Sequence, residues 1–84
     1  MFWWRRFVAH RLQAEGTSGT DIMEFQRVLN RRARHYGIQV KETGVYDAET
    51  IAAVRSYQDI KLNLKADGFV GPLTAAKLHI QLEE

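Results

Sequence analysis

Apolar residues recur at spacings of three and four along residues 21–36, which predicts an amphipathic helix. The stripe consists of Ile22, Phe25, Leu29, Ala33 and Tyr36. Asp21 followed by Glu24 is similar to a capping box, with Asp in place of Ser or Thr, and Gly37 is a natural C-terminal stop. We therefore expect one well-defined helix here, with its arginines on a different side from the apolar stripe.

Two further helices are expected after it. Asp47 can cap a helix that continues to Gln58, where apolar side chains again recur at helical spacing. Pro72 is well placed at the first position of a third helix, because the missing N–H has no helical partner there. The inner side of this last helix is expected to carry Leu73, Ala76, Leu78 and Leu82.

The segments that precede these two helices repeat one phrase. "GVYDAET" at 44–50 and "GFVGPLT" at 68–74 each contain a glycine turn, a short extended apolar pair and a threonine in the first helical turn. Glycine is expected to supply positive φ or a close backbone approach at the two turns. Because one such unit cannot bury its apolar face alone, both units are expected to pack on the helix at 21–36. The pattern predicts a mainly α protein in which three helices, two of them preceded by short extended segments, close on one another.

The N-terminal segment at 1–16, "MFWWRRFVAHRLQAEG", is expected to form an additional aromatic and basic helix. "GTSGT" supplies the expected linker at 17–20, and the main domain follows at 21–82. Trp3, Trp4 and Phe7 lie on one side of that helix. They either pack on the domain, contact a membrane surface or anchor a protein partner. A signal peptide is not expected, because no long apolar stretch follows the arginine pair.

The composition of the chain limits the kinds of fold and functional site that it can form. The chain has 84 residues, 45% hydrophobic and 26% charged, which fits one globular domain. It contains no cysteine, so disulfides and thiolate metal sites are excluded. The net charge is +2, and the excess of basic over acidic residues lies in the first half of the chain. This excess gives only a mild attraction for anions.

Three motifs together resemble the peptidoglycan-binding domain family found at the ends of bacterial and phage cell-wall hydrolases. Phe25-Gln26 takes the place of the family's leucine–glutamine pair, and Tyr57-Gln58 the place of its phenylalanine–glutamine pair. The eight residues at 67–74, "DGFVGPLT", match the family's turn motif in full, whereas the first turn has Thr43 for Asp and Asp47 for Gly. The resemblance covers residues 21–80. It implies a compact three-helix bundle with two turn-like short strands, and non-catalytic attachment to cell-wall glycopeptide.

A binding surface for peptidoglycan or muropeptide fragments is expected around the repeated turns. Tyr46 is the candidate aromatic platform, and Arg55, Gln58 and Asp67 are the candidate polar contacts. Each has a structural alternative: Tyr46 at the core edge, Asp67 as a turn-stabilising residue, Gln58 as a buried hydrogen-bonder and Arg55 as a solvated charge.

No catalytic, cofactor or metal site is expected. The three histidines are far apart in the sequence, and no phosphate-binding loop is present. The alternative function is a protein-docking or assembly module that uses the same fold, with Trp3, Trp4 and Phe7 as the interface to a catalytic or assembly protein. Nucleic-acid binding is disfavoured, because the helix at 47–58 carries Arg55 as its one basic residue. The sequence does not determine localisation, although cell-wall association or release by a phage is suspected.

Overall fold

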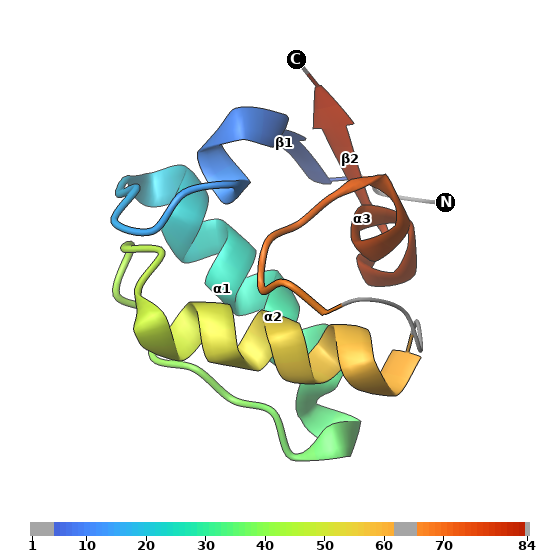
Figure 1. The fold of residues 1–84 in the computed structure, drawn as a ribbon. Coiled ribbons are helices and arrows are strands. Elements are labelled where there is room, and N and C mark those ends of the chain that lie inside the picture. The colour runs from blue at the N-terminus through green and yellow to red at the C-terminus, as the bar shows by residue number, and fades with distance from the viewer. Residues whose placement is uncertain (1–4, 62–65, 84) are drawn as a thin grey trace.

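A computed structural model describes residues 5–61 and 66–83. Three helices dominate the fold (Figure 1): α1 spans Thr20–Ala33, α2 spans Ala48–Lys61 and α3 spans Pro72–Leu78. Short 3₁₀ helices follow β1 (η1, Ala9–Leu12) and α1 (η2, Arg34–Tyr36). The mainly α bundle expected from the sequence is therefore confirmed.

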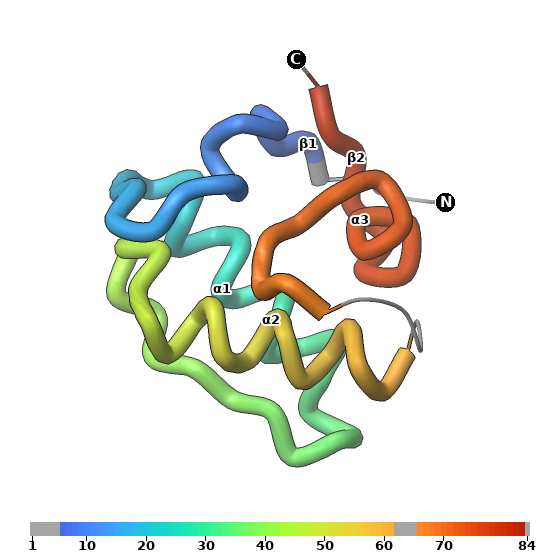
Figure 2. Tube along the Cα trace, in the orientation of Figure 1, coloured from blue at the N-terminus to red at the C-terminus, as the bar shows by residue number. Residues whose placement is uncertain are grey.

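The two strands come from opposite ends of the chain. β1 spans Arg5–Val8 and β2 spans Ile80–Glu83, and they pair in parallel with Arg5 opposite Ile80. In Figure 2 these two segments lie side by side at one edge of the molecule. Two short turn-like strands were expected, but in the turn segments before α2 and α3. Of those segments, Val45 forms a single antiparallel bridge with Ser18, and residues 69–70 lie in no strand.

The N-terminal helix expected over residues 1–16 is not confirmed. Residues 5–8 are extended and residues 9–12 form one 3₁₀ turn, because pairing with β2 requires an extended backbone at this point. Alternation along β1 places Phe7 in the core, at 4% exposure. Trp3 and Trp4 lie outside the described residues.

Helix boundaries follow local signals closely. Gly37 has φ +74° and ends the helical region after η2, and Pro72 is the first residue of α3, both as expected. α3 ends earlier than expected: His79 adopts a left-handed conformation at φ 59°, and the chain leaves the helix to form β2. Leu82 therefore reaches the core from a strand rather than from a helix.

One hydrophobic core connects all these elements. Its buried members are Phe7, Leu12, Ile22, Phe25, Val28, Leu29, Ala33, Ile38, Val40, Tyr46, Ala53, Val54, Tyr57, Val70, Ala75, Leu78 and Ile80. Phe7 and Leu12 belong to this core, so the segment before α1 packs as part of the same body as the three helices. Residues 16–19 continue that packing, with backbone hydrogen bonds from Gly16 N–H to Tyr46 O and from Gly19 N–H to Gly44 O.

Candidate functional site

Two buried glutamines organise the repeated turns. Gln26 on α1 faces the first turn, and Gln58 on α2 faces the second; they are 0% and 4% exposed. Each side chain accepts a hydrogen bond from the turn glycine N–H, at Gly44 and Gly68 respectively, both at 2.9 Å. Each turn is thus held by one buried glutamine, Gln26 of α1 for the first turn and Gln58 of α2 for the second. We call this arrangement a glutamine clamp.

The side-chain amide nitrogens of the two glutamines also donate to corresponding atoms of the two turns. Gln26 Nε2 donates to Val45 O at 2.8 Å and to Thr50 Oγ1 at 2.9 Å. Gln58 Nε2 donates to Phe69 O at 2.8 Å and to Thr74 Oγ1 at 2.9 Å.

Thus Thr50 and Thr74, whose spacing in the sequence suggested a structural role, are the buried acceptors of the two clamps. No buried side-chain nitrogen or oxygen in the described part of the chain lacks a partner, so both turns are fully satisfied.

Gln58 and Asp67, both expected at a ligand surface, have structural roles in the second turn. Gln58 Oε1 also accepts from Asp67 N–H, at 3.1 Å. Asp67 Oδ1 accepts from Phe69 N–H at 2.9 Å, which is the turn-stabilising bond typical of an Asx residue. Gln58 is buried beneath the turn, whereas Asp67 is exposed and its Oδ2 has no partner among the described residues.

Tyr46, the expected aromatic platform, is completely buried. Its hydroxyl donates to Gly68 O at 2.8 Å, so it links the first unit to the second turn. Burial raises the pKa of this phenol, and the charge of Asp67 adds to that effect. A ligand that approaches from solvent therefore has no access to the Tyr46 ring in this structure.

Phe69 is the half-buried ring next to it. Its ring stacks on Tyr46 with centroids 5.8 Å apart and an interplanar angle of 17°, and Tyr46 stacks in turn on Phe25 at 5.8 Å. Phe7 closes the row with an edge contact to Phe25 at 6.0 Å. The row runs from the buried ring of Phe7 in β1 to the surface of the second turn, so Phe69 is its partly exposed end.

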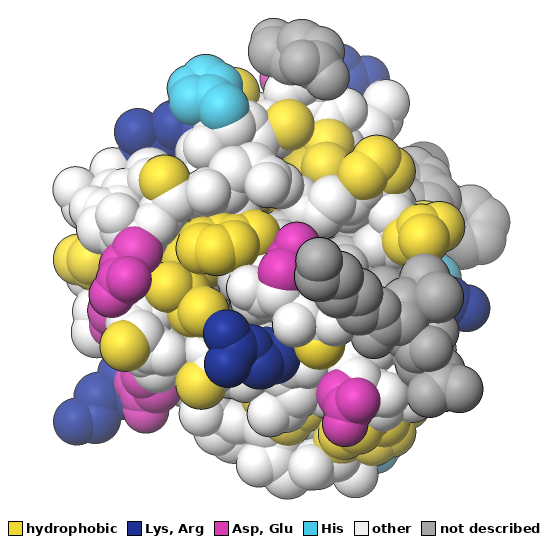
Figure 3. All heavy atoms as spheres, viewed as in Figure 1, with side chains coloured by type: hydrophobic (Ala, Val, Ile, Leu, Met, Phe, Trp, Pro, Cys, Tyr) yellow, Lys and Arg dark blue, Asp and Glu magenta, His cyan; other side chains and the backbone are white. Residues whose placement is uncertain are grey.

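Arg55 lies on the side of α2 that faces the second turn. It follows Ile51, which packs against Gly68, by one helical turn, and it precedes Gln58 by three residues. The residue is exposed and makes no hydrogen bond or ion pair within the described part of the chain. Figure 3 shows this face of the molecule, with a basic side chain over the middle of α2 next to apolar surface.

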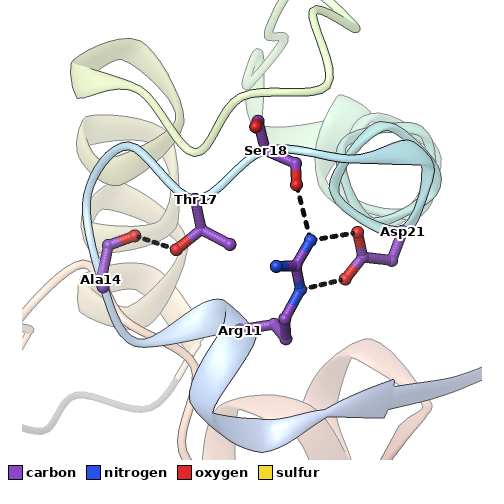
Figure 4. A network of polar contacts seen from close by, with 5 residues as sticks. All are labelled: Arg11, Ala14, Thr17, Ser18 and Asp21. Carbon is purple, nitrogen blue, oxygen red and sulfur yellow. Dashed lines mark hydrogen bonds and ion pairs between the residues drawn. The ribbon is translucent and has the colours of Figure 1, made fainter.

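The segment before α1 is fixed by an arginine that the sequence did not single out for a role. Arg11 on η1 binds Asp21 on α1 through two hydrogen bonds of 2.9 Å, and its Nη2 also donates to Ser18 O at 2.6 Å (Figure 4). Asp21 was expected to cap α1. Instead α1 begins at Thr20, so Gly19 occupies the N-cap position without a side-chain bond and Asp21 lies within the first turn, where its carboxylate is paired with Arg11.

Two carboxyl groups make stability depend on pH. The hydrogen bond from Arg11 holds the pKa of Asp21 below its ordinary value, against a smaller effect of burial. Burial alone would raise the pKa of Asp47, but hydrogen bonds from Thr50 and Thr43 together outweigh it and lower that pKa. Asp47 is therefore the cap of α2 that the sequence predicted.

We expect the contribution of these two carboxyls to thermal stability to be constant from neutral pH down to about 5 and to fall below that. A carboxyl with a depressed folded pKa contributes its stability above the unfolded pKa of about 3.9 and loses it as pH falls through the folded value. Melting temperatures measured at intervals from neutral pH to pH 2 check this. Asp47→Asn should flatten the acid limb, whereas Asp59→Asn, at an exposed position, should leave it unchanged. Identical acid limbs in Asp47→Asn and the parent would contradict the assignment.

An open groove of about 800 Å³ runs between η1, the second turn with α3, and β2. One side is formed by Ala9, His10 and Gln13, and the other by Val70, Gly71 and Pro72. Gln13 bridges the two sides, since its Nε2 donates to Val70 O. None of the four ligand-site residues expected from the sequence lines this groove.

Within residues 5–61 and 66–83, no three of the histidine, aspartate and glutamate side chains cluster in a way that could hold a metal ion. None of the helices described combines the length and hydrophobicity of a membrane span. Phe7, expected as an interface anchor, is buried against Phe25 and is not available to a partner.

The sequence did not predict the roles of three residues, Gln26 and Arg11 in the fold and Phe69 at the surface of the second turn. Gln26 could have been paired with Gln58, because each follows an aromatic residue and precedes a glycine turn. Phe69 could have been weighed against Tyr46, since both are rings within the repeated phrase. Nothing in the sequence marked Arg11 as the partner of Asp21.

A family model described as "Putative peptidoglycan binding domain" matches residues 18–78, which is more than half of the chain. The matched region contains both glutamine-held turns and all three helices, whereas β1, η1 and β2 lie outside it. No curated protein and no solved structure matches the chain. The match agrees with the motifs at 25–26, 57–58 and 67–74, and the chain belongs to the peptidoglycan-binding domain family.

Proposed function

We propose that this domain is a non-catalytic module that attaches to bacterial cell-wall peptidoglycan through the second turn and the adjoining side of α2. Its family membership supports peptidoglycan binding in general. The observation that carries the proposed site is the Gln58 clamp. It fixes the second turn, while Arg55 and Asp67 Oδ2 have no hydrogen-bond or ion-pair partner among residues 5–61 and 66–83.

The exposed groups match the chemistry of a muropeptide. Arg55 can bind a carboxylate of the wall peptide, and Asp67 Oδ2 can accept a hydrogen bond from an amide or a sugar hydroxyl. Phe69 presents the partly exposed ring in the place first assigned to Tyr46. Because the turn is already satisfied internally, these groups are preorganised, which reduces the entropy lost on binding.

A binding role rather than a catalytic one is supported by how three of the aspartates are used. Asp21 is bound to Arg11, Asp47 caps α2 and Asp67 stabilises its own turn. A general acid or base needs a carboxyl free to exchange a proton with substrate at a suitably shifted pKa. These three carboxyls serve the fold instead.

The sedimentation of purified sacculi tests the proposal. We expect the parent protein to pellet with sacculi and Arg55→Ala to bind about tenfold more weakly, since a hydrogen bond to a charged group contributes about 1.5–3 kcal/mol. Arg31→Ala removes a charge at another exposed arginine, on α1, that forms no ion pair with any described residue, and this variant should bind as the parent does.

Parent protein that stays in the supernatant would exclude the function. Equal losses in Arg55→Ala and Arg31→Ala would show a response to net charge and exclude the site.

A further inference from the structure

The groove between η1, α3 and β2 combines the family region with segments outside it. The residues from Val70 to Ala76 that line it belong to the matched region, whereas Ala9, His10 and Gln13 precede that region and Ile80, Gln81 and Leu82 follow it. The groove therefore depends on the parallel pairing of β1 with β2, which brings both ends of the chain to α3.

Its lining has one titratable residue, His10, and is otherwise made of apolar side chains, many of them small, and neutral amides. Ala9, Ala75, Ala76 and Leu82 supply methyl groups, and Gln13 and Gln81 supply amides. No Asp, Glu, Lys or Arg lines it. In Figure 3 the surface over α3, towards β2 and η1, shows apolar and neutral atoms without a charged side chain among them.

This lining disfavours a charged ligand, and it also disfavours a sugar ring that would stack on an aromatic side chain. An ion placed here would lose hydration with no Asp, Glu, Lys or Arg of the groove to pair with it. No Phe, Tyr or Trp lines the groove either, whereas the partly exposed ring of Phe69 lies outside it. Methyl-sized apolar contacts with neutral amides at the margins suit a short peptide of small side chains, which alternates methyl groups with backbone amides.

We propose that this groove binds the uncharged, alanine-containing part of a peptidoglycan stem peptide, as a subsite distinct from the surface of Arg55, Asp67 and Phe69. The proposal rests on the proposed function for the identity of the polymer. The volume of about 800 Å³ is within the range of sites that enclose small ligands, about 300–1,000 Å³. Gln13 Nε2 is engaged by Val70 O, so its Oε1 is the acceptor that it offers to a ligand amide.

The second turn separates the two surfaces. Asp67 and Phe69 belong to the side near α2, whereas Val70 and Gly71 line the groove. A muropeptide held on both sides of this turn would be bound through its sugar or charged part on one surface and through its peptide in the groove. Two weak subsites joined by one ligand give a higher affinity than either alone.

Amide shifts of the ¹⁵N-labelled full chain test the assignment with three probes: a disaccharide–pentapeptide muropeptide, its disaccharide and its free pentapeptide. We expect the muropeptide and the free peptide to shift the amides of Gln13, Gly71, Ala76 and Gln81. The disaccharide should leave those amides unchanged.

Two variants change the groove without touching the core. Ala76→Glu places a charge on an exposed groove position of α3, and Gly71→Asp fills open space at a residue whose added Cβ would meet nothing within 4 Å. Each should weaken binding of the free peptide at least tenfold. Ala52→Glu, the same substitution as the first at an exposed position of α2, should change it less than twofold.

Sedimentation with sacculi, run in parallel, separates this proposal from the function on which it rests. Protein that binds sacculi while neither the muropeptide nor the free peptide moves the groove amides would overturn the groove assignment and leave the function intact. Groove amides that respond to the disaccharide would overturn the peptide assignment. A protein that binds neither sacculi nor peptide would overturn both the proposed function and the groove assignment. A protein that binds peptide in the groove but does not bind sacculi would overturn the proposed function and support the groove assignment.

Discussion

Gln58→Leu is expected to lower the free energy of unfolding by about 3 kcal/mol or more, because it leaves several buried partners unsatisfied at about 1–3 kcal/mol each. Leucine has similar bulk but neither donates nor accepts, so Gly68 N–H, Phe69 O and Thr74 Oγ1 all lose their bonds to this side chain. For a domain of this size the melting temperature should fall by roughly 15 °C, at about 4–8 °C per kcal/mol. Urea and thermal unfolding followed by circular dichroism measure both quantities.

Gln39→Leu is the matched control for this experiment. Gln39 is exposed, and its side chain makes one long bond, of 3.4 Å, to Asn30 O. The same substitution there should stay within about 0.5 kcal/mol of the parent. Gln26→Leu should behave like Gln58→Leu, since its amide holds the first turn in the same way. A small effect at position 58 would mean that the turn rearranges without cost and that the clamp does not fix it.

Gly68→Ala is the second substitution with a large expected effect, about 3 kcal/mol, from two separate causes. The φ of +84° is unfavourable for any residue with a Cβ. An added Cβ would also lie 2.5 Å from Ile51 Cγ2 and 2.9 Å from Ile51 O, so the second turn would have to move away from α2. Both the unfolding free energy and the position of Asp67 and Phe69 should change.

Gly37→Ala separates the two causes. Gly37 also has a positive φ, +74°, but an added Cβ there would meet nothing within 4 Å. Its replacement should therefore cost only the backbone term, about 1–2 kcal/mol. If both substitutions cost the same in urea unfolding, then close contact between Gly68 and Ile51 does not contribute and the turn is free to shift.

These substitutions concern the support of the proposed binding surface rather than the surface itself. Gln58 and Gly68 position the turn that carries Asp67 and Phe69, so their replacement should weaken sacculus binding through loss of geometry. Arg55→Ala, in contrast, should weaken binding at unchanged stability. The comparison of stability with binding across the three variants distinguishes supporting residues from contact residues.

The helical regions could be predicted because their signals are local. The stripe from Ile22 to Ala33, the cap at Asp47, the proline at position 72 and the stop at Gly37 each act within one or two helical turns. The repeated phrase correctly indicated two glycine turns of positive φ, at Gly44 and Gly68. The family resemblance came from the same residues.

The site was only partly predictable. The sequence indicated Arg55 and Asp67, which are exposed, but it could not rank the two rings of the repeat. Tyr46 is inside because its ring fits between Phe25 and Phe69 and its hydroxyl reaches Gly68 O, and these partners come from three parts of the chain. The groove was not foreseen, because its walls come from segments far apart in the sequence.

By itself the sequence determined the three helices, the two glycine-hinged units and the family, since each follows from side chains a few residues apart. Only the tertiary structure decided that the first segment becomes a strand, that Arg11 pairs with Asp21, and which ring meets solvent. The physical reason is that a short segment such as Arg5–Val8 has little conformational preference of its own. Its pairing with Ile80–Glu83 and the burial of Phe7 against Phe25 supply the free energy that selects the extended form.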